Sequence, residues 1–448
     1  MLLFTLIIAA IGIYNLYHLR SAEEFLVAGR RSGGLTTGGS LAATILGGSS
    51  TLGLAGLAFA QGLTGSWWLL VGALGLLCLL IFIPAVKAQP AYTLPELIGK
   101  WYGLEVRRIA SVLILISWLG IVGAQANAAG RILSTFFGGS GSGWTLVCGG
   151  VFILYTAAGG QLSVIRTDLV QILLIVSGLV GCAALGLAAL GGPAGLRAAL
   201  PPGHLSFPLS PGMRPGELAV LLLVVGSTYL IGPDMLSRVF CSRSVPAARR
   251  GIVYTLLIIV PMAFVIALIG LEARAAFPGA SPEAAFPLMI KNILPPALAG
   301  LAIAALIAAF LSSADTTLLT MSAIITVDLL GRKQPRLGHL RLATCLCGAA
   351  ALLTGILSGG IIPALLLGYT IFSGGLFVPI LAGLTGSRMS RLSAALCIVC
   401  GGGLACAGKL AGLDLLIAAG FLVSLLIFAG DCALRSLRSL RAQRADNG

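Results

Sequence analysis

The chain has 448 residues, of which 58% are hydrophobic and only 9% are charged, and its mean hydropathy is +1.04. Soluble domains carry about 25% charged residues, so this composition excludes a soluble globular protein. It predicts an all-α polytopic membrane protein without room for an extramembrane domain. The formal net charge of +14 would suit a nucleic-acid surface, but its distribution along the chain argues for a topology signal instead.

Thirteen apolar segments each approach or exceed the ~20 residues that cross the hydrocarbon core of a bilayer. We expect helices at residues 1–18, 35–62, 66–88, 107–137, 143–159, 166–190, 217–237, 251–271, 296–328, 342–359, 361–384, 392–410 and 413–433. The first segment lacks a positively charged region and an obvious cleavage site, so we expect a retained helix rather than a secretory signal. Residues 1–448 are predicted to form a single transmembrane domain.

The basic residues predict the orientation. If the helices alternate from an outside amino terminus, 22 of the 28 Lys and Arg residues fall in the inner loops and the carboxyl-terminal tail. The other six are Arg131, Arg197, Arg214, Arg274, Lys291 and Lys409. Because basic residues concentrate on the cytoplasmic side, we expect a plasma (inner) membrane protein with its amino terminus outside and its carboxyl terminus in the cytoplasm. No nucleic-acid partner is expected.

Two cysteine pairs have spacings found in metal or redox sites. They are Cys345 with Cys347 and Cys397 with Cys400. No histidine or further cysteine cluster accompanies them, so we interpret them as small packing residues within helices. These cysteines therefore predict no metal or redox site, and the short loops offer no catalytic group of a membrane-embedded enzyme.

The expected helix 296–328 contains an unusual polar stretch at Ala308–Thr317, with a carboxylate and four hydroxyls. Ala309, Ser312 and Ser313 are spaced i, i+3 and i+4, so they share one helix face. Polar groups within a membrane span usually face a partner, a cavity or an ion. Hard oxygen ligands suit a small alkali cation. Alternatively, the hydroxyls bond back to carbonyls one turn earlier in their own helix.

The expected helix 35–62 carries adjacent glycines, Gly47 and Gly48, followed by three hydroxyls at Ser49–Thr51. This composition weakens a helix, and a helix broken at mid-membrane frees carbonyls that need a ligand or a protein partner. The alternative is a glycine-rich notch for close helix packing. The segment therefore indicates either an ion-binding break or a packing contact.

Four segments together resemble the sodium:solute symporter family, which includes sodium-coupled sugar, proline, pantothenate and sialic acid carriers. They lie at residues 21–31, 93–103, 155–171 and 294–315. The first two are similar to the family's first and second inner loops, and the others to its sixth and ninth spans. The resemblance extends over nearly the whole chain.

The resemblance implies a LeuT-type fold of two inverted repeats of five helices. In this chain the repeats would cover about 35–190 and 217–384, with extra helices at 1–18, 392–410 and 413–433. It also implies a sodium site between the first and eighth core helices. Carried over by position, its ligands would be the carbonyls of Ala43, Leu46 and Ala309 and the hydroxyls of Ser312 and Ser313.

A second cation site is implied less directly. Asp168 matches a position near the serine pair, and Asp315 and Thr316 stand where a sialic acid carrier of the family has two serines. Two carboxylates and a hydroxyl would hold a cation or share a proton. Alternatively, Asp168 pairs with Arg166 or another inner basic residue, and Asp315 bridges helices.

Polar residues at midplane depth are the candidates for solute binding. They are Gly47, Ser49, Ser50, Gln125, Asn127, Arg131, Ser227, Thr228, Asp234, Tyr369 and Ser373. Arg131 either grips a carboxylate or reaches out to the membrane interface, and Asp234 either faces the solute or pairs with Arg238. The residues that bind sugar in sodium–glucose carriers are not evident at the matching positions. An organic acid or amino acid is therefore favoured over a sugar.

These observations predict a sodium-coupled symporter that imports a small polar organic solute by alternating access. Its partners would be Na⁺, the solute and the lipid bilayer, with a monomer as the functional unit. One alternative keeps the fold but couples transport to protons through Asp168 or Asp315. Another is a transporter-like membrane sensor, although such proteins usually carry an appended signalling domain.

Overall fold

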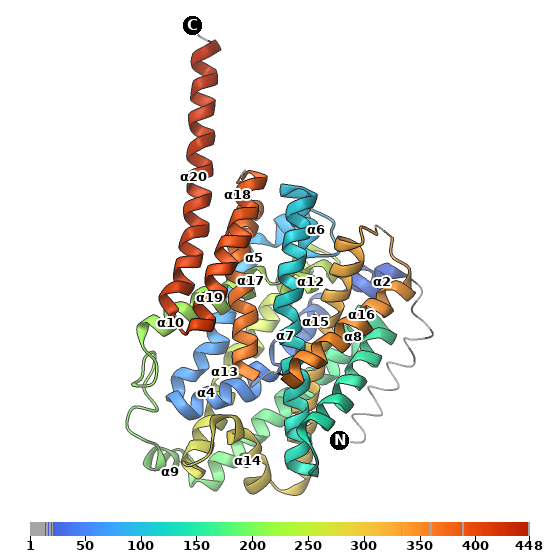
Figure 1. Ribbon diagram of the computed structural model, residues 1–448. Coiled ribbons are helices and arrows are strands. Elements are labelled where there is room, and N and C mark those ends of the chain that lie inside the picture. The colour runs from blue at the N-terminus through green and yellow to red at the C-terminus, as the bar shows by residue number, and fades with distance from the viewer. Residues whose placement is uncertain are drawn as a thin grey trace.

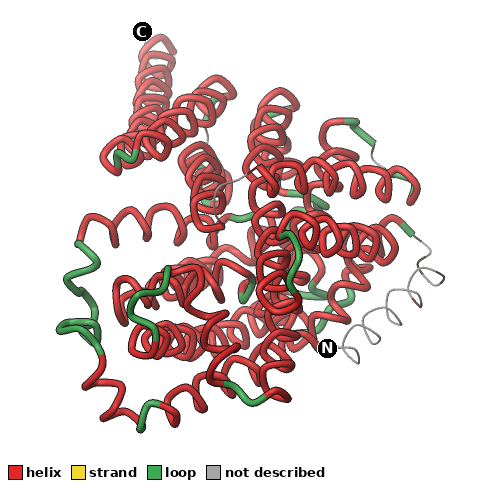
Figure 2. The backbone as a smooth tube through the Cα atoms, turned by 60° about the horizontal axis from the view of Figure 1, so that its bottom comes forward, coloured by secondary structure: helices red, strands yellow, loops and turns green. Residues whose placement is uncertain are grey.

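The computed structural model describes Tyr14, Tyr17, Leu19 and residues 21–332, 334–357, 361–387 and 389–446. Helices joined by loops make up these residues (Figure 2), and no strand is formed among them. Two isolated β-bridges join Ser32 to Ser242 and Ser210 to Met213. The predicted all-α class is thus confirmed.

The helical segments follow one another along the whole described chain. In order they are α2 (Ala22–Val27), η1 (Ala28–Arg30), α3 (Gly34–Ile45), η2 (Ser49–Gly53), α4 (Leu54–Gln61), η3 (Gly62–Ser66), α5 (Trp67–Lys87), α6 (Leu94–Tyr102), α7 (Leu104–Phe137), α8 (Gly141–Ala189), α9 (Gly192–Ala199), α10 (Pro215–Leu221), η4 (Leu222–Gly226), α11 (Ser227–Ile231), α12 (Pro233–Cys241), α13 (Val245–Ala276), η5 (Pro282–Ala284), α14 (Ala285–Ile293), α15 (Pro296–Ala323), η6 (Ile324–Leu329), α16 (Leu337–Leu357), α17 (Ile361–Leu384), α18 (Arg391–Leu396), η7 (Cys397–Gly401), α19 (Gly402–Ala411) and α20 (Asp414–Asp446). Ten continuous helical stretches of the described chain are long and apolar enough to cross a membrane. The predicted helix 1–18 lies outside the described residues except for Tyr14 and Tyr17, so the count of thirteen stays a prediction.

The two helices expected at 143–159 and 166–190 are the two arms of α8, whose 49 residues are divided by a kink at Gly160. Straight, it would be about 74 Å long, more than twice the ~30 Å hydrocarbon core. It bends at Gly160, which has φ 57° and ψ −164°. The Tyr155 hydroxyl consequently meets Ser163 Oγ at 3.0 Å and Thr167 Oγ1 at 2.8 Å. A glycine bend thus replaces the loop expected between the two spans, because glycine tolerates positive φ.

Two helices are broken in the middle of the bundle. Helix α3 ends at Ile45, Leu46 leaves helical geometry at φ −77° and ψ 41°, and helical structure resumes after Gly48. The break expected from the Gly-Gly-Ser-Ser-Thr sequence is therefore confirmed. A second break lies at Gly232, whose ψ of 139° separates α11 from α12. Pro233 then starts α12 at a position where proline costs no helical hydrogen bond.

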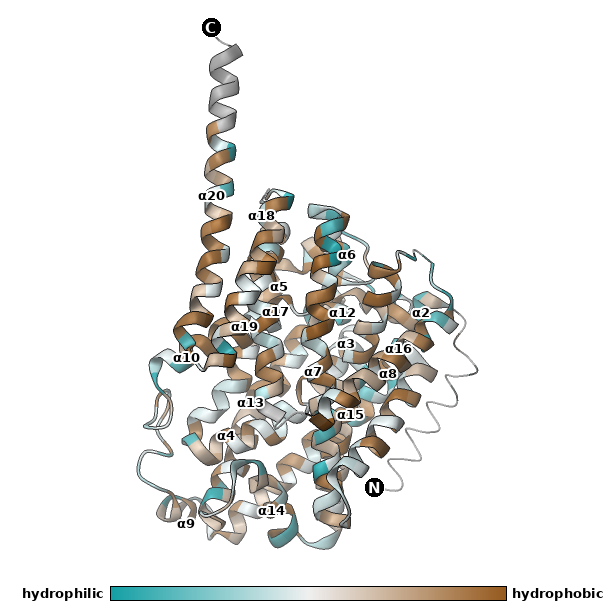
Figure 3. Ribbon diagram, in the orientation of Figure 1, coloured by the Kyte–Doolittle hydropathy of each residue, from teal (hydrophilic) through white to brown (hydrophobic). Residues whose placement is uncertain are grey.

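The bundle has two distinct ends (Figure 1). Helices α2 and α6 lie at one end, named here the α6 end, and helices α9 and α14 lie at the other, the α14 end. Apolar residues dominate the long helices between them (Figure 3). Large apolar side chains such as Leu154, Leu173 and Leu346 are exposed on these helices, as expected for surfaces that face lipid.

Candidate functional site

Ser312 and Ser313 of α15 are buried, and their hydroxyls bond to other segments. Ser312 Oγ donates to Asp168 Oδ1 at 2.5 Å, and Ser313 Oγ donates to the Thr44 carbonyl at 2.6 Å. Thr316, one turn later, instead donates back to the Ser312 carbonyl at 3.0 Å. The back-bonding alternative therefore applies to the threonine but not to the serine pair.

The broken end of α3 meets this serine face directly. A Cβ at Gly47 would lie only 2.0 Å from Ser313 Oγ, so the two elements touch through the glycine. Ala43 and Leu46 are fully buried at this helix end, and Ala309 is fully buried one turn before Ser313. The last carbonyls of a helix have no intrahelical N–H partner. The structure thus brings the segments that carry the five predicted sodium ligands into contact.

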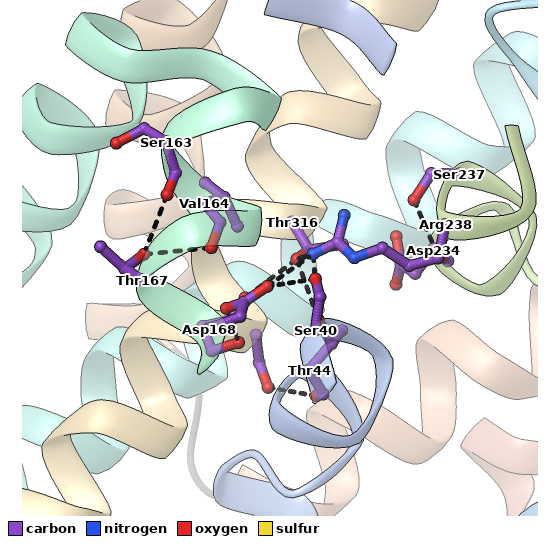
Figure 4. Close-up of polar contacts among 12 residues, drawn as sticks. Ser40, Thr44, Ser163, Val164, Thr167, Asp168, Asp234, Ser237, Arg238 and Thr316 are labelled. Carbon is purple, nitrogen blue, oxygen red and sulfur yellow. Dashed lines mark hydrogen bonds and ion pairs between the residues drawn. The ribbon is translucent and has the colours of Figure 1, made fainter. Parts of the chain in front are cut away.

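A buried ion pair lies beside the serines (Figure 4). Arg238 Nη2 lies 3.2 Å from Asp168 Oδ2, and neither side chain is exposed. The same nitrogen donates to Thr44 Oγ1 at 3.1 Å and also to Thr316 Oγ1. Ser40 Oγ donates to the second oxygen of Asp168. A guanidinium therefore stands next to two of the three residues predicted for a second cation.

The third of these residues, Asp315, points elsewhere. Its Oδ1 accepts a hydrogen bond from Thr156 Oγ1 in the first half of α8, and its Oδ2 has no hydrogen-bond partner among the described residues. The structure therefore divides the predicted second-cation set between two neighbouring places. Arg238 is the base that pairs with Asp168, although the sequence suggested it as a partner of Asp234.

Sequence reasoning missed several members of this network. Ser40 and Thr44 lie one turn apart on α3, and this i, i+4 spacing of hydroxyls in an apolar segment was the available signal. Arg238 is a charge at the end of an expected span, and nothing in the sequence shows that it turns toward α8 rather than toward Asp234. The contact depends on how the breaks orient α3 and α12.

Among the solute candidates, Gln125 lies directly at the α3 break. Its Oε1 accepts a hydrogen bond from the Gly48 backbone N–H at 2.8 Å. Ser49 and Ser50 follow in η2 and are buried. Helix α7 thereby fixes one side of the break while α15 contacts it from the other.

Asp234 faces α7 rather than its own helix. Trp118 Nε1 donates to both carboxylate oxygens at 2.9 Å. The indole makes an edge contact with Phe372 at 4.7 Å between centroids, and the Tyr369 ring lies 6.5 Å away. These contacts bring α7, α12 and α17 together at the second break.

Other candidates bond within their surroundings. Asn127 Nδ2 donates to the Gly355 carbonyl at 2.7 Å. Arg131 donates to Asn127 Oδ1 at 3.0 Å and pairs with Glu283 at 2.5 Å, close to the α14 end. Hydroxyls that donate to carbonyls of their own helix belong to Ser227, Thr228 and Ser373. The solute candidates therefore form two groups. One group lies at the breaks of the two interrupted helices, and the other bonds to residues away from these breaks.

Comparison with known proteins gives a consistent result. The pattern of the sodium:solute symporter family matches residues 25–353. The chain is 26% identical to human sodium/myo-inositol cotransporter 2 over 75% of its own length and 56% of that protein. It is also 26% identical to the osmoregulated proline transporter OpuE of Bacillus subtilis, over 71% of this chain and 68% of that protein. The chain thus spans little more than half the length of the human relative.

Solved structures share the fold. A Na⁺-coupled sialic acid symporter in a substrate-bound outward-open state superposes with a TM-score of 0.83, at 20% identity over 96% of both chains. Mhp1, a nucleobase-cation-symport-1 family transporter in a closed conformation, gives a TM-score of 0.62 at 13% identity, over 93% of this chain and 95% of that one. The predicted LeuT-type fold is confirmed. On this fold and on the match that covers most of its length, the chain is a multi-pass membrane protein of the sodium:solute symporter family, a family of transporters rather than enzymes.

Proposed function

We propose that this protein is a sodium-coupled symporter that imports a small polar solute by alternating access through two inverted repeats of five helices. The observation that supports it best is the serine pair of α15. Ser312 and Ser313 direct their hydroxyls out of their own helix, toward α8 and toward the broken end of α3. Such a meeting of a broken helix and a hydroxyl face provides oxygen ligands at mid-membrane depth.

Sodium would bind as a co-transported substrate. Its ligands would be the carbonyls of Ala43, Leu46 and Ala309 and the hydroxyls of Ser312 and Ser313. The Ser313 hydroxyl, which donates to the Thr44 carbonyl at 2.6 Å, would turn its lone pairs to the ion. Neutral oxygens replace part of the hydration shell without full charge neutralisation, so release on the other side stays feasible.

One sodium ion per cycle is the stoichiometry we favour. Arg238 already places a positive charge at Asp168 and Thr316, where a second cation would compete with it. One Na⁺ moving down 100 mV provides about 2.3 kcal/mol, which supports roughly fiftyfold accumulation of a solute. The concentration gradient of Na⁺ adds to this value.

The α6 end is the cytoplasmic end in this proposal, with the amino terminus outside and the protein in the plasma membrane. An amino acid or organic acid remains favoured over a sugar. A second candidate keeps the fold and couples transport to a proton on Asp315, because its Oδ2 is buried without a partner among the described residues. An unpaired charge at such a place is costly, which favours the neutral acid.

The test measures binding of ²²Na⁺ and Na⁺-dependent thermal stabilisation of the purified protein, with K⁺ as the replacement ion. Ser313→Ala should weaken apparent Na⁺ affinity by roughly tenfold or more, since a ligand is lost. Ser322→Ala is the matched control, because Ser322 is buried further along α15 and donates only to the Leu319 carbonyl at 3.0 Å. Equal Na⁺ affinity in wild type and Ser313→Ala would reject the site.

A further inference from the structure

The buried middle of the bundle holds more negative than positive side chains. Asp168, Asp234 and Asp315 are buried there, and Arg238 is the one basic side chain buried among the described residues. Arg238 lies 3.2 Å from Asp168. Among the described residues, Asp234 has no basic group within the 4 Å of an ion pair. Arg238, four residues further along α12, acts on Asp234 only from beyond ion-pair distance. A buried carboxylate without a directly paired base is costly, so a positive group that enters from outside would stabilise this position.

The surroundings of Asp234 leave room for another donor. A carboxylate offers about four lone-pair positions, whereas Trp118 supplies one N–H that both oxygens share at 2.9 Å. Asp234 lies directly after the break at Gly232, at the level where the two interrupted helices of such a fold form their solute site.

Two further aromatic rings lie beside the indole that binds this carboxylate. Trp118 lies 4.7 Å from Phe372 and 6.5 Å from Tyr369, measured between ring centroids. Ring faces attract cations, and this attraction grows when water is excluded. The chemistry of the site is thus one carboxylate beside a set of aromatic rings.

A small void lies on the side of the α6 end. Its volume is about 10 Å³, and its wall includes Pro233, Ser237 and Thr320 but not Asp234. This volume suits about one water molecule. Asp234 itself is buried, so a solute would reach it or leave it when the helices part on one side.

From these observations we propose that Asp234 and its aromatic neighbours bind the positively charged nitrogen of the solute. The substrate class would then be ammonium compounds, either amino acids or quaternary amines, rather than sugars or simple carboxylates. This inference rests on the proposed transport function. Sodium itself fits the place poorly because the site offers one carboxylate and rings instead of a shell of hard oxygens.

The experiment compares solutes that differ in the charged nitrogen. Thermal stabilisation of the wild-type protein is measured with L-proline against cyclopentanecarboxylate and with choline against 3,3-dimethylbutan-1-ol, in Na⁺ and in K⁺. We expect at least one ammonium compound to bind roughly tenfold or more tightly than its partner, as for a charged hydrogen bond. Failure of both ammonium compounds to bind, or equal binding within each pair, would overturn the proposal without any variant.

Variants assign the effect to the carboxylate. Asp234→Asn keeps an acceptor for the Trp118 N–H but loses the charge, so the preference for the ammonium compound should fall roughly tenfold. Asp234→Glu keeps the charge and should retain more of the preference. Stabilisation by Na⁺ alone should persist in Asp234→Asn, which separates loss of solute recognition from loss of the sodium site. An unchanged preference in Asp234→Asn would refute the assignment.

Discussion

The two ends of the bundle are closed by ion pairs of very different character. At the α6 end, Arg107 Nε lies 2.7 Å from Asp328 Oδ1, and the aspartate side chain is completely buried. Thr93 Oγ1 donates to the same oxygen at 3.0 Å. At the α14 end, Arg131 and Glu283 lie 2.5 Å apart, but 42% of each side chain is exposed.

Further hydrogen bonds hold the segments of the α6 end together. At the α6 end, Arg30 Nη2 donates to the Ala91 carbonyl at 2.9 Å, Lys87 Nζ donates to the Ser242 carbonyl at 2.6 Å, and the Ser32 backbone pairs with that of Cys241. Exposed ion pairs contribute about 0–1 kcal/mol, whereas removing one partner of a buried pair costs about 3–5 kcal/mol. The protein should therefore open more readily at the α14 end, which is the outer end in the proposed topology.

The largest expected effect comes from removing the buried pair at the α6 end. Arg107→Ala leaves Asp328 buried without its partner, so unfolding free energy should fall by about 3–5 kcal/mol. Hydrogen exchange should accelerate in α6 and η6, because Arg107 also donates to the Val327 carbonyl at 2.9 Å. Melting temperature and exchange measured by mass spectrometry test both statements.

Arg108→Ala provides the matched control, because Arg108 is the adjacent arginine and its side chain is exposed. It should leave melting temperature and exchange nearly unchanged, since surface substitutions usually change stability by less than about 0.5 kcal/mol. Similar losses in both variants would show that the buried pair does not distinguish the α6 end.

A smaller effect is expected at the α14 end. Arg131→Ala removes an exposed pair, so local stability should fall by about 1 kcal/mol or less. Faster exchange should be confined to η5, α14 and the adjoining end of α7. Raising ionic strength from about 0.1 to 1 M should reproduce part of this effect in the wild type, since screening shortens the Debye length to about 3 Å. If salt accelerated exchange in α6 rather than in α14, the α6 end would be the one closed by a screened ion pair, contrary to this prediction.

The sequence predicts the helices well because burial in lipid demands long apolar segments. The expected helix 361–384 coincides with α17, and 296–328 ends one residue before η6 does. The interruption of α8 falls where the expected helix 143–159 ends, but its form as a glycine kink rather than a loop was not predicted, because glycines such as Gly159 and Gly160 also occur in packed helices. The kink is identified by the positive φ of Gly160, a backbone property that the sequence does not show.

The site shows a similar limit. The spacing of Ser312 and Ser313 and the glycine pair at 47–48 indicated which two segments meet, since both features are local. The pairing of Arg238 with Asp168 joins residues 70 positions apart. Its geometry depends on the break at Gly232, which separates α11 from α12. Contacts set by such breaks cannot be derived from helical periodicity.

The smallest expected effect concerns pH at the α14 end. His204 lies in the loop between α9 and α10, where its backbone carbonyl accepts a hydrogen bond from the Leu63 N–H at 2.7 Å. Burial, followed by the nearby charge of Arg274, lowers the pKa of His204 below its usual value of 6.5. The closed loop thus favours the neutral imidazole. Its contribution to stability is fully present above about pH 6.5 and is lost as pH falls through the lowered pKa.

Hydrogen exchange of residues 200–214 should consequently accelerate between pH 6.5 and 5 after correction for intrinsic rates, while α6 shows no corresponding change. His204→Gln removes the titration and should abolish this dependence, and the partly exposed position keeps the effect small. Arg274→Gln should weaken the dependence because it removes the repelling charge. If residues 200–214 kept the same pH response in His204→Gln, a group other than His204 would control the pH dependence of this loop.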